Sequence, residues 1–215
     1  MSWDTVGFNV LGQHVPLVEL AGNASSLSSV WLAIRGSAWC WPAQLAGNVG
    51  MFAVYLHAGL GGNAIRQVAF ASLAVYGITR WRHRADGGEL VVRRASWATR
   101  AAIGLSLAGL TGVVIVFLAA SGTSTQPVPD GAILAGSLAA TVLQARALLE
   151  FWWCWLLVDG IGVPMCLRSA LYVTGAVYIT FGVLAVAGLR TWAAIRTSQL
   201  ADATTSPSPS DGHRP

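Results

Sequence analysis

Seven apolar stretches, separated by short connections, run through most of this chain of 215 residues. A helix needs about 20 apolar residues to cross the hydrocarbon core of a bilayer, and these stretches approach or reach that length. Charged residues make up only 10% of the chain, against roughly 25% in soluble domains. We therefore predict an all-α, polytopic membrane protein with transmembrane helices near residues 17–34, 39–57, 64–81, 100–120, 131–147, 150–167 and 170–190.

Basic residues are distributed unevenly between the connections. The third connection carries a run of arginines, whereas residues 121–130, after the fourth stretch, contain none. Cytoplasmic loops are enriched in Lys and Arg, so the third connection is predicted to be cytoplasmic. The N-terminus would then lie outside and the C-terminus inside, in a bacterial cell (inner) membrane. The arginines concerned are Arg80, Arg82, Arg84, Arg93, Arg94 and Arg100.

The chain divides into three predicted regions. Residues 1–16 would form an extracellular N-terminal segment, and residues 17–192 the transmembrane domain. Residues 193–215 end in a Ser-, Thr-, Pro- and Asp-rich sequence without apolar periodicity. Such a composition cannot bury enough apolar surface to fold, so we predict a disordered cytoplasmic tail.

The transmembrane domain shows an internal repeat. Shifting the chain by about 114 residues places Trp39-Cys40-Trp41 on Trp153-Cys154-Trp155 and Leu20-Ala21-Gly22 on Leu134-Ala135-Gly136. Accidental matching of helices rich in Ala, Gly and Leu is the alternative explanation. The shift moves the first helix onto the fifth, so both copies would have one orientation. We predict a 3+1+3 parallel-repeat arrangement, with repeats at about 17–81 and 131–192 and a linker helix at about 100–120.

Polar and aromatic residues share one face of the sixth stretch. Trp152, Trp155 and Asp159 have the spacing i, i+3, i+7, which places them on the same side of a helix. An Asp in an apolar segment costs about 2.5–3.5 kcal/mol on insertion scales and usually faces the bundle interior or a watered cavity. Asp159 is therefore a candidate binding residue. The alternatives are a structural hydrogen bond for Asp159 and an interfacial position for the tryptophans.

The second and third stretches add four more candidates. Trp41, Gln44 and Asn48 repeat the spacing of the sixth stretch, although about three residues out of register with the 114-residue shift. Gln67 begins a third face, where it could instead bridge two helices. Together, these residues predict a substrate site formed by Trp41, Gln44, Asn48, Gln67, Trp152, Trp155 and Asp159.

A flat heteroaromatic ring with hydroxyl groups fits this set of side chains. Tryptophan faces stack on aromatic rings, and amide or carboxylate groups hydrogen-bond ring edges and hydroxyls. The cysteines and histidines lack metal-ligand or catalytic spacing, so we expect no metal, cofactor or catalytic residue. A basic face with exposed aromatics is missing too, which argues against nucleic-acid binding.

Two other functional classes stay open at this level. An intramembrane enzyme would use Asp159 as an acid or base, and a regulatory subunit would use the polar residues only to join helices. Glu150 lies four residues after Arg146, and we interpret this spacing as an exposed ion pair rather than a gate.

Three stretches resemble the PnuC-type vitamin permeases. They are Arg35-Gly-Ser-Ala-Trp39-Cys-Trp41-Pro42, the Gln67 helix with Tyr76-Gly77 and Arg80-Trp81, and Glu150-Phe-Trp-Trp-Cys-Trp155-Leu-Leu-Val-Asp159 before Gly162-Val163-Pro164. The resemblance extends from about Leu17 to Trp192. It implies a three-plus-one-plus-three fold, a homotrimer, and facilitated diffusion of a vitamin that is then trapped by phosphorylation.

Within that family the chain is most like the riboflavin-transporting branch, RibM. Nicotinamide riboside transporters typically have Asn at the position of Asp159, so the sequence departs from them there. The resemblance therefore implies riboflavin as the substrate, with nicotinamide riboside as the alternative and thiamine third. Riboflavin would stack on Trp152 or Trp155, with Asp159 or Asn48 bonded to a ring N–H or a ribityl hydroxyl.

Overall fold

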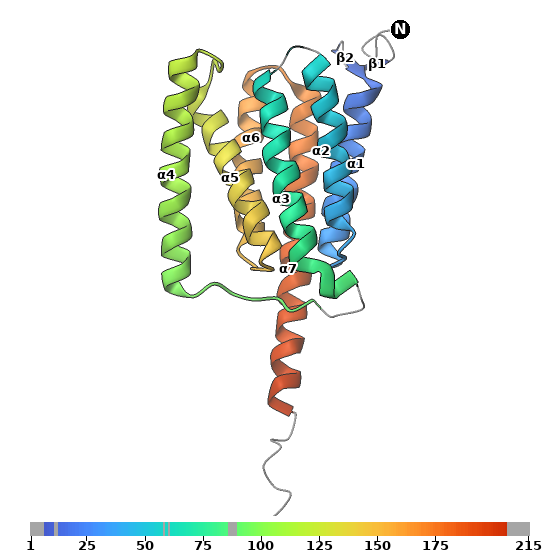
Figure 1. Ribbon diagram of the computed structural model, residues 1–215, viewed down its shortest axis with the longest axis vertical. Helices are drawn as coiled ribbons and strands as arrows, with labels where there is room; N and C mark the ends of the chain where they lie inside the picture. Colours follow the sequence, from blue (N-terminus) through green and yellow to red (C-terminus); the bar gives the residue numbers. More distant parts are fainter. Residues whose placement is uncertain (1–6, 11–12, 58, 60, 86–89, 206–215) are drawn as a thin grey trace, which may run out of the picture.

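Seven helices form the body of the protein in the computed structural model, which describes residues 7–10, 13–57, 59, 61–85 and 90–205 (Figure 1). The all-α, seven-helix prediction is confirmed, and each helix overlaps one predicted stretch. One short hairpin, β1 (Gly7–Val10) and β2 (Gln13–Pro16), precedes the helices and was not predicted. The helices are α1 (Leu17–Ile34), α2 (Cys40–His57), α3 (Gly61–Ala85), α4 (Trp97–Ser121), α5 (Pro127–Ala145), α6 (Phe151–Arg168) and α7 (Tyr172–Thr205).

Three of these helices have the length and composition to cross a membrane by themselves. They are Trp97–Ser121, Pro127–Ala145 and Tyr172–Thr204. Local sequence signals set their ends. The Ser96 hydroxyl accepts a hydrogen bond from the Thr99 amide at the start of α4, and Gly122 ends that helix with a left-handed φ of 63°. Pro127 is the first residue of α5, a position where no amide hydrogen is needed.

The last helix is longer than the sequence indicated. We predicted disorder from residue 193 onward, whereas α7 continues to Thr205. The reason is a long-range contact. The Gln199 side chain accepts a hydrogen bond from the Val92 amide (3.2 Å) and donates one to the carbonyl oxygen of Leu90, which fixes this turn of α7. Residues 206–215 of the predicted tail lie outside the described residues.

The helices alternate in direction, and their contacts repeat. α1, α3, α5 and α7 run one way, and α2, α4 and α6 run the other (Figure 1). α2 packs between α1 and α3, α6 packs between α5 and α7, and the two groups meet where α1 contacts α7 and α3 contacts α5. If α1, α2 and α3 are replaced by α5, α6 and α7, and the reverse, the same pairs of helices are in contact. The pattern agrees with a parallel 3+1+3 arrangement, which is our interpretation of it.

Residue contacts give the register of the repeat. Trp41 in α2 packs on Gly77 in α3, and Trp152 in α6 packs on Gly188 in α7. Each member of the second pair lies 111 residues after its counterpart. These faces are therefore in register at 111 residues, three fewer than the shift of about 114 that superposed the two Trp-Cys-Trp sequences. Because helix contacts decide which side chains are equivalent, Trp41 corresponds to Trp152 and not to Trp155.

Two tryptophans join the repeats by reciprocal hydrogen bonds. The Trp81 Nε1–H of α3 donates to the carbonyl oxygen of Ala145 at the end of α5, at 3.0 Å. The Trp192 Nε1–H of α7 donates to the carbonyl oxygen of Ala33 at the end of α1, also at 3.0 Å. A helix leaves its last carbonyl groups without intrahelical partners, so each indole caps a helix of the other repeat.

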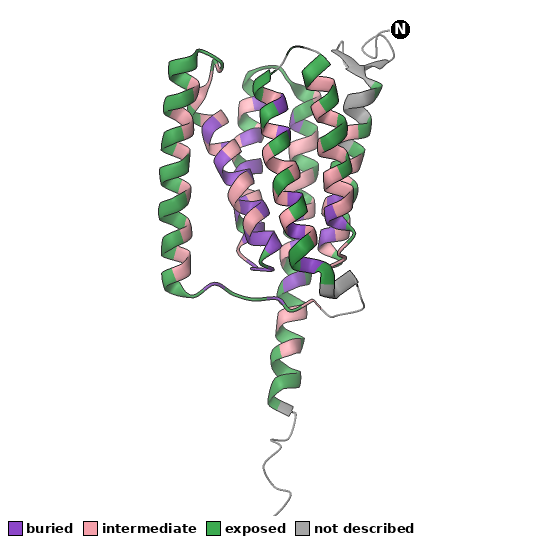
Figure 2. Ribbon diagram, viewed as in Figure 1, coloured by how far each residue is buried: buried purple, intermediate pink, exposed green. Residues whose placement is uncertain are grey.

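The linker helix α4 lies at the side of the bundle and packs on α5 (Figure 1). It contains no buried residue, whereas α5 is buried along much of its length (Figure 2). Gly131 allows the approach, because a Cβ there would lie 2.7 Å from the Ile115 side chain. Most of α4 therefore faces the surroundings of the bundle, as expected of a helix in lipid.

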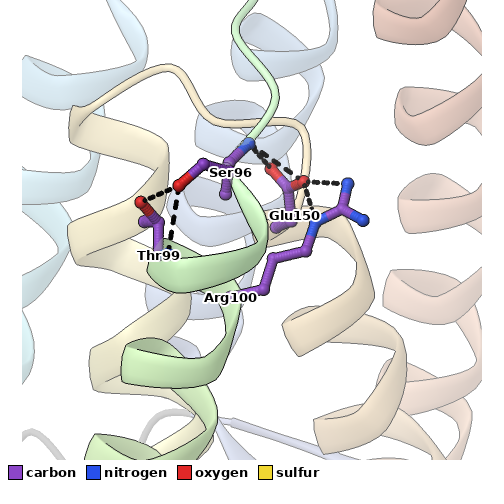
Figure 3. A network of polar contacts seen from close by, with 5 residues as sticks. Ser96, Thr99, Arg100 and Glu150 are labelled. Atoms are coloured by element: carbon purple, nitrogen blue, oxygen red, sulfur yellow. Dashed lines mark hydrogen bonds and ion pairs between the residues drawn. The ribbon is translucent and has the colours of Figure 1, made fainter.

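An extended segment, residues 90–96, crosses one end of the bundle and leads into α4 (Figure 1); we call it the strap. Its Ala95 amide donates to both carboxylate oxygens of Glu150, at 3.1 Å each (Figure 3). Arg100, in the first turn of α4, binds the same carboxylate with an ion-pair distance of 2.8 Å. The predicted pairing of Glu150 with Arg146 is therefore wrong. Ala147, in a left-handed conformation with φ 55°, follows Arg146 and turns the chain between the two residues.

Candidate substrate-binding cavity

A cavity of about 340 Å³ lies inside the bundle, between the two groups of three helices. Side chains of α1, α2, α3, α5, α6 and α7 line this cavity, and α4 contributes none of the described lining residues. This volume is within the range of roughly 300–1,000 Å³ that is usual for small-molecule sites. Of the seven predicted site residues, six line the cavity: Gln44, Asn48, Gln67, Trp152, Trp155 and Asp159.

Trp41 is the predicted site residue that does not line the cavity. Its side chain is completely buried, and its ring meets Trp81 edge-on with centroids 5.6 Å apart. Gly77 admits the ring so closely that a Cβ there would lie 2.2 Å from it. The structure therefore places Trp41 in the core between α2 and α3, where it supports the site from outside.

Two polar side chains at equivalent positions of the repeat face the cavity without protein partners. Asp159 is only 6% exposed, and its Oδ2 atom has no hydrogen bond within the described part of the chain. Asn48 corresponds to it in α2, and its Nδ2 atom is likewise buried and unbonded there. An unmet polar group in a buried place costs about 1–3 kcal/mol, more when charged. Asn48 thus offers a donor and Asp159 an acceptor to a molecule in this cavity, and Trp152 of the same wall has a further buried donor, its Nε1–H, without a partner in the described part of the chain.

Aromatic rings form much of the remaining wall. Trp155 is half-buried, so part of its ring faces the cavity. Trp152 is only 1% exposed and is held by Phe151 at 4.2 Å and by Trp192 at 6.0 Å between ring centroids. Trp155 therefore offers the more accessible surface for stacking, while Trp152 forms a fixed part of the wall.

The structure adds cavity residues that sequence reasoning missed. Tyr178 and Phe181 of α7 line the cavity, as do the equivalent residues of α3, Gln67 and Phe70. The repeat at its correct register of 111 residues would have identified both. Gln144 also lines the cavity, and its Nε2 lies 3.9 Å from the Cys40 sulfur. A glutamine within an apolar stretch was the available signal for this residue.

The serine hydroxyls in the wall differ from the side chains of Asn48 and Asp159 because backbone carbonyl groups already bind them. Ser29 donates to the carbonyl oxygen of Cys40 at 2.9 Å, and so joins α1 to α2. Ser137 donates to the carbonyl oxygen of Ile133 one turn earlier, at 2.7 Å. Both hydroxyls therefore stabilise the helices, whereas Asn48 Nδ2 and Asp159 Oδ2 have no partner within the described residues.

The fold and the cavity define a polytopic helical membrane protein with a cavity of small-molecule size between two helix groups, which is the architecture of a permease. Residues 16–194 match the model of a family described as nicotinamide mononucleotide transporters. The chain therefore belongs to this family, the PnuC family, as its sequence resemblance implied. It is accordingly a transporter, and the prediction that it is not an enzyme agrees with its relatives.

Two similar proteins have been characterised or solved. The riboflavin/roseoflavin transporter RibM of Streptomyces davaonensis is 35% identical over 198 residues, which cover 89% of this chain and 92% of that protein. The crystal structure of the vitamin B3 transporter PnuC is similar in fold, with a TM-score of 0.68 and 17% sequence identity. That similarity covers 85% of this chain and 83% of the solved one. The second similarity concerns the fold alone.

Proposed function

We propose that this protein imports riboflavin by facilitated diffusion and that phosphorylation of the vitamin inside the cell keeps it there. The observation that carries the proposal is the pair of unbonded polar atoms, Asn48 Nδ2 and Asp159 Oδ2, beside the aromatic wall. The similarity to a riboflavin/roseoflavin transporter supports the choice of vitamin.

Riboflavin has the hydrogen-bonding groups that Asn48 Nδ2 and Asp159 Oδ2 lack as partners within the described residues. Its isoalloxazine ring is flat and electron-poor, which suits stacking on Trp155 and contact with Phe181. Its ring carries an N–H donor between two carbonyl acceptors, and its ribityl chain carries hydroxyls. Asp159 accepts from an N–H or a hydroxyl, and Asn48 donates to a carbonyl or a hydroxyl. Burying both polar atoms against the ligand removes the cost of leaving them unmet.

The proposal includes an orientation and an assembly. The end of the bundle with the strap carries most arginines, so we place it in the cytoplasm of a bacterial cell, with the N-terminus outside. The bilayer, and neighbouring copies in a homotrimer, would cover the exposed apolar side chains of α4, such as Val113 and Phe117. The absence of any second carboxylate among the described residues lining the cavity is in keeping with uncoupled diffusion.

Nicotinamide riboside is the second candidate, and one observation favours it. Its ring is a cation, and a carboxylate beside aromatic faces suits a cation. Asp159 supplies such a carboxylate, although Arg66 in the same wall offsets its charge. The two substrates are therefore best separated by direct competition.

The test is uptake of labelled riboflavin into vesicles that contain the purified protein. We expect saturable uptake that stops when the riboflavin concentration inside the vesicles equals that outside. Further accumulation is expected when a riboflavin kinase and ATP are enclosed in the vesicles. Asp159→Ala and Trp155→Ala are expected to reduce uptake at low riboflavin by about tenfold or more, since each removes an interaction of about 1.5 kcal/mol. Trp153→Ala is the matched control, because Trp153 is 61% exposed on the outer side of the same helix and should keep uptake near normal.

Each outcome decides one part of the proposal. Vesicles that take up nicotinamide riboside but no riboflavin would contradict the substrate. Full uptake by both cavity variants would contradict the site. Failure to transport either vitamin would contradict the permease assignment itself.

A further inference from the structure

A second cavity lies on the outside of the bundle, beneath the strap. It has a volume of about 530 Å³ and is bounded by the strap, the first turn of α4, the α5–α6 connection and the last turns of α7. Three arginines line it: Arg93, Arg94 and Arg196. No acidic side chain is among the described residues of its wall. We call it the arginine groove.

Hydrogen bonds from three elements hold the walls of the arginine groove in place. The Arg93 amide donates to the carbonyl oxygen of Ala147, and the Leu149 amide donates to the carbonyl oxygen of Arg93, both at 2.9 Å. Gln199 binds the strap from α7. Because the strap is fixed by its backbone, the side chains of its arginines are free to bind something else.

Glu150, which follows the α5–α6 connection, is already engaged by other groups. Glu150 accepts hydrogen bonds from the Ala95 amide and from Arg100 (Figure 3). That contact is the one ion pair found within the described residues, so none of the three groove arginines has an acidic partner there. Three like charges around one cavity repel one another, and an anion bound between them would remove that repulsion.

The position of the arginine groove indicates where the anion comes from. Trp97 begins α4 beside the groove and is 82% exposed, which is typical of tryptophans at the boundary between hydrocarbon and lipid headgroups. The groove is also lined by exposed apolar side chains, Val91 at 57% and Leu200 at 53%. A groove lined by both arginines and exposed apolar side chains fits a molecule that has a charged and an apolar part.

We propose that the arginine groove binds the headgroup of an anionic phospholipid. The guanidinium groups bind the phosphodiester through paired N–H donors, and Val91 and Leu200 contact the glycerol and the start of the acyl chains. Such a lipid would hold the strap and the end of α7 against the bilayer surface. This inference does not depend on the identity of the transported vitamin.

The experiment is native mass spectrometry of the full-length protein in a neutral detergent, titrated separately with phosphatidylglycerol and phosphatidylcholine. We expect wild-type protein to bind phosphatidylglycerol at least tenfold more tightly. Basic residues at an anionic surface each contribute a factor of about five, so Arg94→Gln with Arg196→Gln should weaken binding by roughly 25-fold. The matched control combines Arg80→Gln with Arg82→Gln, which removes two exposed arginines from the same end of the bundle but outside the groove. This control should bind within about twofold of wild type.

Three results would overturn the inference. Equal binding of the two lipids would show that the site does not recognise an anionic headgroup. Equal losses in the groove variant and the control would show that only total charge matters. Competition by inorganic phosphate or riboflavin 5′-phosphate, as tight as the lipid and lost in the groove variant, would assign the site to a soluble ester. Unchanged melting temperatures of both double variants establish that the comparison concerns folded protein.

Discussion

Replacing Gly188 by alanine tests whether Trp152 forms part of the binding wall. A Cβ on Gly188 would lie 2.2 Å from the Trp152 ring, whereas ordinary contact begins at 3.4 Å, so the ring has to move by more than about 1 Å. Phe151 and Trp192 block other directions, with centroids 4.2 Å and 6.0 Å away. The ring is therefore displaced toward the cavity that it lines.

The repeat provides a matched control for this change. A Cβ on Gly77 would also lie 2.2 Å from a tryptophan ring, that of Trp41, which does not line the cavity. Overpacking of this kind costs about 1–3 kcal/mol in either place. Alanine recovers up to roughly 1 kcal/mol of helix propensity equally in both. We expect both variants to lose similar stability, and only Gly188→Ala to bind riboflavin about tenfold more weakly.

Calorimetric titration of each variant with riboflavin, alongside thermal unfolding in detergent, measures the two effects. Gly77→Ala should keep its affinity within about twofold of wild type. If the two variants lose affinity equally, the effect is a general loosening of the bundle. If Gly188→Ala is destabilised but binds normally, Trp152 is not part of the wall.

Three further predictions concern the contacts that hold the bundle together. Trp81→Phe and Trp192→Phe should each lower the unfolding free energy by about 0.5–1.5 kcal/mol, and by similar amounts, because each loses one indole hydrogen bond of 3.0 Å; urea unfolding measures this. Glu150→Gln should cost about 1.5–3 kcal/mol in thermal unfolding, since it replaces the charged acceptor of the strap. Gln199→Ala should speed tryptic cleavage at the strap arginines severalfold, whereas Gln126→Ala, which loses a bond to Ser169 at the other end, should leave the rate unchanged.

The sequence by itself determined the helices and the residues that share their faces. Long apolar stretches with few charges specify membrane helices wherever they are placed, because the backbone must bond internally in lipid. The spacing i, i+3, i+7 likewise put Trp152, Trp155 and Asp159 on one side of α6, and all three line one cavity. These properties are local, so they follow from a single stretch of chain.

Only the tertiary structure decided which neighbour each face meets. Trp41 and Trp152 occupy equivalent positions, yet Trp41 packs against Trp81 and lies outside the wall that Trp152 helps to form. Glu150 forms its ion pair with Arg100, 50 residues away, and not with Arg146, four residues away. Helical periodicity fixes the direction of a side chain relative to its own helix. The packing of distant helices fixes what lies in that direction, and that depends on contacts that no single stretch contains.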